Sequence, residues 1–154
     1  MRLITVSNDF FKLCGDDPEL LDKGGTRPHV LVMRLRYKGA KHLFAVPLRS
    51  NISPNTPKEQ YYALPPRSTT KPRHRHGLHY IKMFPILKQH QRKMRIEGNA
   101  FYETLQRILD TNESIIVDQC QRYLDAYADG SHPRYCVDID AALRKLYGSR
   151  PNRK

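Results

Sequence analysis

The chain is poor in cysteine and lacks long apolar runs, and both absences limit the class of protein it can be. Its three cysteines, Cys14, Cys120 and Cys136, are too few and too scattered for a disulfide framework. No apolar stretch reaches the roughly 18 residues of a membrane span, and the first residues lack a signal-peptide pattern. We therefore expect a protein of a reducing compartment, the cytoplasm, without a membrane partner.

Sequence motifs of several enzyme classes are also missing. Without Gly-x-Ser-x-Gly, an acyl-transfer triad has no support. The run RHRHGLH contains His74, His76 and His79, but neither Cys-x-x-Cys nor His-Glu-x-x-His accompanies it. Its arginines would repel a divalent cation, so we expect no metal and no cofactor. No zinc-finger, basic-zipper or RNA-recognition signature occurs either, which leaves charge as the main guide to the partner.

Negative charge is absent from one long segment. The chain has 27 Lys and Arg against 15 Asp and Glu, a formal net charge of +12, yet no acidic residue lies between Glu59 and Glu97. Positive charges along such a segment repel one another unless they face a polyanion. The segment therefore favours nucleic acid as the partner over an anionic membrane, and over the alternative of a basic surface that only contacts solvent. Aromatic residues beside such a segment suit the unstacked bases of single-stranded RNA, although each of them can equally be a core residue. They are Tyr61, Tyr62, Tyr80 and Phe84.

The first third of the chain alternates between strand and helix patterns. Residues 2–6 predict a strand and 7–15 a short helix that ends at Gly15. Residues 29–50 predict a β-hairpin that turns at Lys38-Gly39. Its first strand alternates strictly, with Val30, Val32, Arg34 and Arg36 on one face. Pro47 has no amide proton, so it marks an edge, a bulge or the end of the second strand.

The rest of the chain predicts a long loop, one more strand and helices. Five of the eleven prolines fall in residues 51–77, a loop with room for a short strand at 61–64. Residues 78–86 predict a further strand. Apolar stripes at helical spacing predict three helices, over 99–112, 112–130 and 138–148.

This order of elements argues for an α+β class. We expect a twisted antiparallel sheet or partly closed barrel flanked by helices, with the helices packed on one side. Residues 1–150 would form a single domain, and residues 151–154 a disordered tail.

The hairpin's second strand, HLFAVPLRSN (42–51), ends in a polar group: Arg49, Ser50 and Asn51. Such a group suits RNA cleavage, because RNA carries its own nucleophile, the 2′-hydroxyl. Cleavage then needs a base, an acid for the leaving 5′-oxygen and cations for the phosphorane. Arg49 would clamp the phosphate, Ser50 would bind a phosphate oxygen or the 2′-hydroxyl, and His29 would carry the proton. His79 and Lys82 are reserves for that role, and His29 can alternatively be a simple strand-end histidine.

Three stretches resemble the ToxN/AbiQ-like toxins of type III toxin–antitoxin systems. They are MRLITVSNDFFK, YKGAKHLFAVPLRSN and GLHYIKMFPI, in this order and followed by C-terminal helices. The resemblance implies a metal-independent endoribonuclease with a twisted antiparallel sheet, active in plasmid maintenance and abortive phage infection. It also implies an inhibitor, a pseudoknot-repeat RNA antitoxin that the toxin trims and then binds in a protein–RNA assembly.

The residues of the family's active site can be matched to positions of this sequence, and several of them differ. Ser50 matches the family's Pro-Leu-x-Ser exit, whereas Arg49 stands where the family has threonine. Ile52 replaces a lysine, and Arg49 would supply the missing cation. Phe10 replaces a tyrosine, so it can stack on a base but cannot transfer a proton. His29 replaces a lysine that opens the second strand.

We therefore predict catalysis by Arg49, Ser50 and His29, with 2′,3′-cyclic phosphate and 5′-hydroxyl products from single-stranded RNA. A non-catalytic basic RNA-binding module is the main alternative. A DNA-binding regulator that uses a C-terminal helix is weaker, because those helices carry many acids. The predicted RNA-binding residues are Phe10, Asn51, Lys71, Arg73, Arg75, His79, Lys82, Arg92 and Lys93.

Overall fold

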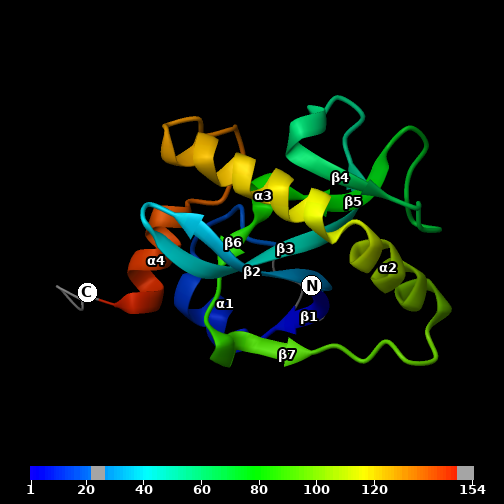
Figure 1. Cartoon of the computed structure of the whole chain (residues 1–154), viewed down its shortest axis with the longest axis horizontal. Coiled ribbons are helices and arrows are strands. Elements are labelled where there is room, and N and C mark those ends of the chain that lie inside the picture. The colour runs from blue at the N-terminus through cyan, green and yellow to red at the C-terminus, as the bar shows by residue number, and fades with distance from the viewer. Residues whose placement is uncertain (22–26, 149–154) are drawn as a thin grey trace.

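A computed structural model describes residues 1–21 and 27–148, apart from the side chains of 31–33, so the predicted tail at 151–154 lies outside the described residues. Its centre is a twisted antiparallel sheet of seven strands (Figure 1). The strand order is β4-β5-β3-β2-β1-β7, and β6 pairs with β3 off this path. The strands are Arg2–Val6 (β1), His29–Tyr37 (β2), Ala40–Ile52 (β3), Tyr61–Leu64 (β4), Arg75–His79 (β5), Phe84–Pro85 (β6) and Gln91–Lys93 (β7). Among the described residues β4 and β7 are the two edges, so the sheet is open and the barrel alternative is not adopted.

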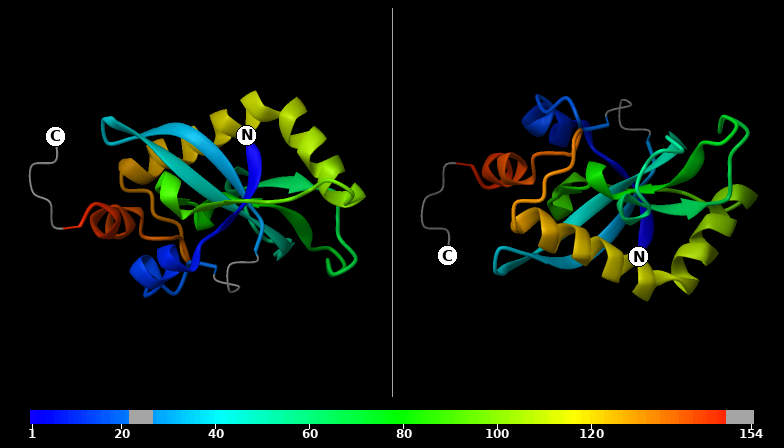
Figure 2. Two further views of the ribbon diagram at one scale, coloured as in Figure 1. Left: turned by 90° about the horizontal axis from the view of Figure 1, so that it is seen from below. Right: turned by 90° about the horizontal axis from the view of Figure 1, so that it is seen from above.

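Helices cover both faces of the sheet, which confirms the α+β class. Leu105 and Leu124 from the C-terminal half pack with Val46 on one face. Phe10 packs with Phe84 on the opposite face. The expectation of helices on one side therefore holds for α2 and α3 and is wrong for α1 and α4, which lie side by side (Figure 2). The helices are Asn8–Cys14 (α1), Ala100–Thr111 (α2), Glu113–Ala128 (α3) and Ile139–Tyr147 (α4).

The hairpin contains a bulge that breaks the predicted alternation. The register of β2 against β3 shifts between Val32 and Leu35, where Arg34 has a φ of 58°. One extra residue moves all later side chains to the other face. Val30 and Leu35, five positions apart by sequence number, therefore join the same buried cluster. The strict alternation predicted from sequence is wrong beyond the bulge.

Pro47 lies inside β3 and does not end it. Pro47 is opposite His29, the last pair of β3 with β2. On the other side of β3, β6 pairs with Ala45 and β5 begins to pair at Leu48. Pro47 thus falls in the gap between two partners, where a missing amide proton breaks no ladder. Beyond it β3 continues to Ile52 as the partner of β5.

The stretch 78–86 is not one strand, and one edge strand was not predicted. β5 ends at His79, a single 3-10 turn spans Tyr80–Lys82 (η2), and β6 follows. This turn brings Lys82 off the sheet. β7 pairs with β1 and has no apolar alternation that sequence could reveal, because it consists of Gln91, Arg92 and Lys93.

Candidate functional site

A cleft of about 470 Å³ opens where β3 exchanges its partner β2 for β5. Its walls come from β3, the loop after β3, β5 and η2, and from two segments distant in sequence. The lining residues are Glu19, Arg49, Asn51, Ser53, Asn55, Thr56, Pro57, Gln60, His79, Ile81, Lys82, Arg134 and Tyr135.

Arg49 and His79 face one another across the two strands. Arg49 Nη1 lies 3.1 Å from His79 Nδ1. A guanidinium only donates, so Nδ1 accepts and the proton of the neutral imidazole is on Nε2. Burial, with a smaller effect of the Arg49 and Lys82 charges, lowers the pKa of His79 to about 3. His79 is therefore neutral at neutral pH and positions the Arg49 guanidinium in the cleft.

Lys82 is the second cation of the cleft and is held on two sides. Its Nζ donates to Glu19 Oε1 at 2.5 Å and to the Tyr135 carbonyl oxygen at 2.8 Å. An ammonium has three protons, so one remains for a ligand. Tyr135 has a φ of 67°, in the left-handed region that bulky residues rarely occupy. Strained backbone of this kind clusters at functional sites, and here it lies beside Lys82.

An aromatic platform borders the same cleft. The Tyr135 side chain is a large exposed aromatic, with 57% of its surface accessible. The Arg134 guanidinium lies 4.9 Å from the centroid of its ring. An exposed ring beside a guanidinium can stack on a nucleic-acid base while the cation meets the adjacent phosphate.

The structure brings four predicted residues together in this cleft: Arg49, Asn51, His79 and Lys82. Asn51 also fixes the neighbouring basic loop. Its side-chain amide donates to the Thr69 carbonyl at 3.2 Å, and its oxygen accepts from the Lys71 amide at 2.7 Å. Lys71, Arg73 and Arg75 are exposed on this loop and on the start of β5. These three predicted residues therefore extend the positive surface outward from the cleft.

His29 and Phe10 lie in the core. His29 is 1% exposed, donates from Nδ1 to the Arg27 carbonyl at 3.0 Å, and packs edge-on against Phe84. Burial lowers the pKa of His29 to about 4. Phe10 is 0% exposed and stacks on Phe84 with ring centroids 4.7 Å apart, so no face of its ring is open to a base. Neither side chain lines the cleft.

Ser50 is half-buried and is not among the lining residues, although it lies between two residues that are. The register of β3 against β5 shifts between Arg49 and Ile52, so Ser50 and Asn51 lie in a bulge that interrupts the alternation of side chains along the strand. Arg49 and Asn51 line the cleft, and Ser50 lies between them in this bulge without being one of the lining residues.

Arg92 and Lys93 are exposed on β7, at the opposite edge of the sheet from β4 and β5. The basic segment that is continuous in sequence is thus divided between two edges. Of its predicted RNA-binding residues, these two are apart from the cleft.

Sequence reasoning missed Glu19, Arg134 and Tyr135. Glu19 belongs to the irregular segment between α1 and β2, and the other two follow Pro133 in the connection from α3 to α4. None of them belongs to a periodic pattern or a motif. Only the three-dimensional arrangement identifies them as part of the site.

No group of three or more His, Cys, Asp or Glu side chains in residues 1–21 and 27–148 is arranged to hold a metal ion. In that same part of the chain, no helix has the length and apolar character needed to cross a bilayer.

Comparison with known proteins gives a match in structure alone. No protein-family model matches the chain, and no curated protein matches its sequence. A structure from a bacterial type III toxin–antitoxin system, in which a non-coding RNA pseudoknot selectively inhibits the toxin, aligns with a TM-score of 0.70 and 19% identity over 94% of this chain and 95% of that chain. A structure from a bacterial antiviral system regulated by a processed non-coding RNA aligns with a TM-score of 0.68 and 14% identity over 96% and 98%.

A third solved structure is AbiQ, a lactococcal anti-phage endoribonuclease of a type III toxin–antitoxin system. It aligns with a TM-score of 0.68 and 14% identity, over 95% of this chain and 96% of that chain. All three alignments span nearly the full length of both partners. The chain therefore has the fold of the ToxN/AbiQ-like toxins, as the resemblance in its sequence implies.

Proposed function

We propose that this chain is an endoribonuclease toxin of a type III toxin–antitoxin system that acts against phage. It cleaves single-stranded RNA in the cytoplasm without a metal ion. An RNA antitoxin of pseudoknot repeats, which the toxin itself processes, inhibits it in a protein–RNA hetero-oligomer. The observation that carries the proposal is the cleft in which Arg49, Lys82 and an exposed Tyr135 converge on a chain with this fold.

Each of these groups has a task in cleavage. Arg49, held by His79, binds the two non-bridging oxygens of the scissile phosphate. Tyr135 stacks on a flanking base and fixes the nucleotide so that its 2′-oxygen lies in line with phosphorus. Lys82 directs its remaining N–H at the leaving 5′-oxygen, stabilises the developing charge and supplies the proton. The products are a 2′,3′-cyclic phosphate and a 5′-hydroxyl.

Cleavage of a labelled single-stranded RNA in EDTA tests this proposal. Wild-type protein should yield cyclic-phosphate ends, and Arg49→Ala should reduce the rate at least 100-fold, because the phosphorane loses a preorganised cation. Arg107→Ala, at an exposed position on α2, is the matched control and should retain the wild-type rate.

The same assay distinguishes the cleft from the position that the family resemblance indicates. Ser50→Ala should cleave within a few-fold of wild type, since Ser50 is not among the residues that line the cleft. A loss in Ser50→Ala with full activity in Arg49→Ala would contradict the cleft as the site of chemistry. RNA that is bound but left intact by wild-type protein would favour the non-catalytic RNA-binding module.

A further inference from the structure

The segment between α1 and the cleft holds Glu19 in a fixed position. Asp17 Oδ1 accepts from the Glu19 amide at 2.9 Å, and Asp17 Oδ2 accepts from the Asp138 amide at 2.9 Å. The next residue, Leu20, is 7% exposed in the cluster beneath α1. Contacts on both sides of Glu19 thus fix its position at the cleft. No pattern in the sequence predicts that this segment lies there.

The Glu19 carboxylate is the single acidic group among the described residues that line this cleft. Its Oε1 accepts from Lys82, and its Oε2 has no hydrogen-bond partner in the described part of the chain. The side chain remains 28% exposed. A carboxylate oxygen with an open lone pair therefore lies beside the cations that would bind a phosphodiester.

The other titratable groups of the cleft do not offer such a lone pair. His79 uses Nδ1 to accept from Arg49, and its Nε2 is buried without a partner in the described residues. Lys82 and Arg134 are donors, and the Tyr135 hydroxyl is a weak base when protonated. Glu19 is the group left to receive a proton from a bound ribose.

We propose that Glu19 is the general base of RNA cleavage in this cleft, an inference that rests on the proposed function. The Glu19 carboxylate takes the proton of the 2′-hydroxyl, the 2′-oxygen forms a bond to phosphorus, and the bond from phosphorus to the 5′-oxygen breaks. The leaving oxygen takes a proton from the Lys82 ammonium. The carboxylic acid of Glu19 then returns its proton to the neutral Lys82 amine through their direct contact, which restores both groups.

Glu19→Gln tests this role with little change in shape, because the amide oxygen can still accept from Lys82. Single-turnover cleavage should fall by about 100-fold or more, the usual contribution of a general base. RNA affinity should stay the same or increase, since a negative charge leaves the cleft. Glu59→Gln, on the nearby 3-10 turn Lys58–Gln60 and outside the cleft lining, removes the same charge and should cleave at the wild-type rate.

The pH profile separates a base from a structural partner of Lys82. Wild-type cleavage should rise with pH along an acid limb that Glu19→Gln lacks, and Glu19→Asp should retain that limb at a lower rate. If folded Glu19→Gln cleaves RNA within three-fold of the wild-type rate, or faster, Glu19 is not the general base. Its carboxylate would then only occupy the site where the phosphate binds. If wild-type protein cleaves no RNA, the proposed function itself fails. Cleavage at similar rates by wild type and Glu19→Gln overturns only the role of Glu19.

Discussion

At the scale of single residues, sequence identifies chemical types but not the environment that decides their roles. His29 and His79 are both histidines near the end of a strand, and both were candidates for proton transfer. In the structure His79 lines the cleft and holds Arg49, whereas His29 lies beneath Phe84 in the core. Burial against Phe84 is a tertiary property, so no local pattern around His29 could reveal it.

The burial of His29 predicts a specific dependence of stability on pH. Its pKa is about 4 in the folded protein against an ordinary value of 6.5, because burial disfavours the imidazolium. The unfolded chain therefore binds more protons between these values, and stability falls as the pH decreases. The contribution of this residue is complete above about pH 6.5, and roughly 2 kcal/mol of it should be lost between pH 7 and pH 5.

Urea unfolding of wild type and His29→Leu at several pH values measures this contribution. The variant should lose less free energy of unfolding on acidification, whatever its stability at pH 7. Val30→Ala, at the neighbouring buried position, should lower stability equally at every pH. A His29→Leu protein with the same pH slope as wild type would show that His29 does not resist protonation in the folded state.

At the scale of elements, the sequence predicts the helices and strands whose apolar residues recur with a regular period. The helices α2, α3 and α4 begin and end within two residues of their predicted limits, because each has an apolar stripe and a polar start or glycine end. The strand β7 and the division of 78–86 could not be predicted, since their pairing depends on β1 and β3 rather than on local pattern. The same is true of the bulge at Arg34, which pairing across the hairpin reveals.

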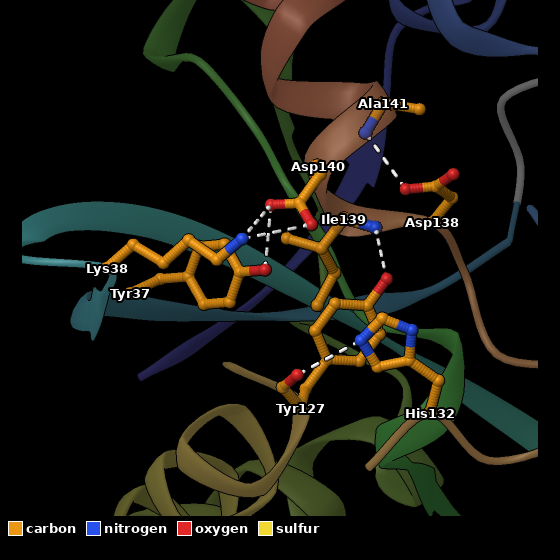
Figure 3. A network of polar contacts seen from close by, with 8 residues as sticks. All are labelled: Tyr37, Lys38, Tyr127, His132, Asp138, Ile139, Asp140 and Ala141. Atoms are coloured by element: carbon orange, nitrogen blue, oxygen red, sulfur yellow. Dashed lines mark hydrogen bonds and ion pairs between the residues drawn. The ribbon is translucent and has the colours of Figure 1, made fainter. Parts of the chain in front are cut away.

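Contacts between elements also join the tip of the hairpin to α4 (Figure 3). The Tyr37 hydroxyl donates to Asp140 Oδ1 at 2.8 Å, and Lys38 Nζ approaches the same carboxylate at 3.2 Å. Tyr37 is 3% exposed, whereas the Lys38 side chain is 55% exposed. The buried hydroxyl therefore depends on Asp140 as its acceptor, and the lysine contributes a weak surface pair.

We expect Asp140→Ala to lower the free energy of unfolding by about 1–3 kcal/mol, because it leaves the Tyr37 hydroxyl buried without an acceptor. Adding Tyr37→Phe should restore part of this loss, since the orphaned hydroxyl is then gone. Lys38→Gln is the control and should change stability by at most about 0.5 kcal/mol. Chemical denaturation of the single and double variants gives the coupling, and strictly additive losses would refute the link between hairpin and α4.

At the scale of the whole molecule, the candidate site draws on segments far apart in the chain. Glu19, Arg49, Lys82 and Tyr135 meet because β3 exchanges partners at Pro47 and because the α3–α4 connection crosses the end of η2. The polar exit of the hairpin was predicted from sequence, and Arg49 and Asn51 do face the cleft. The partners of Arg49 could not be predicted, since their proximity follows from the topology.

The topology of the sheet also divides the basic segment, which is continuous in sequence, between two edges. Lys71, Arg73 and Arg75 lie near the cleft at the β4–β5 edge, whereas Arg92 and Lys93 lie on β7 at the other edge. A continuous charge run in sequence thus becomes two separate positive surfaces. A short RNA that occupies the cleft can reach the first surface, but the sheet lies between it and the second.

Two variants with equal loss of charge distinguish the two surfaces. The first replaces Lys71, Arg73 and Arg75 by glutamine, and the second does the same to Arg92, Lys93 and Arg95. With a single-stranded RNA of about eight nucleotides, the length that one such groove accommodates, the first variant should bind at least about ten-fold more weakly. The dependence of its affinity on salt should fall by about two in log–log slope, from three lost phosphate contacts, while the second variant keeps the wild-type slope. Equal losses in both would mean that net charge alone holds the RNA, and that the division of the basic segment has no consequence for binding.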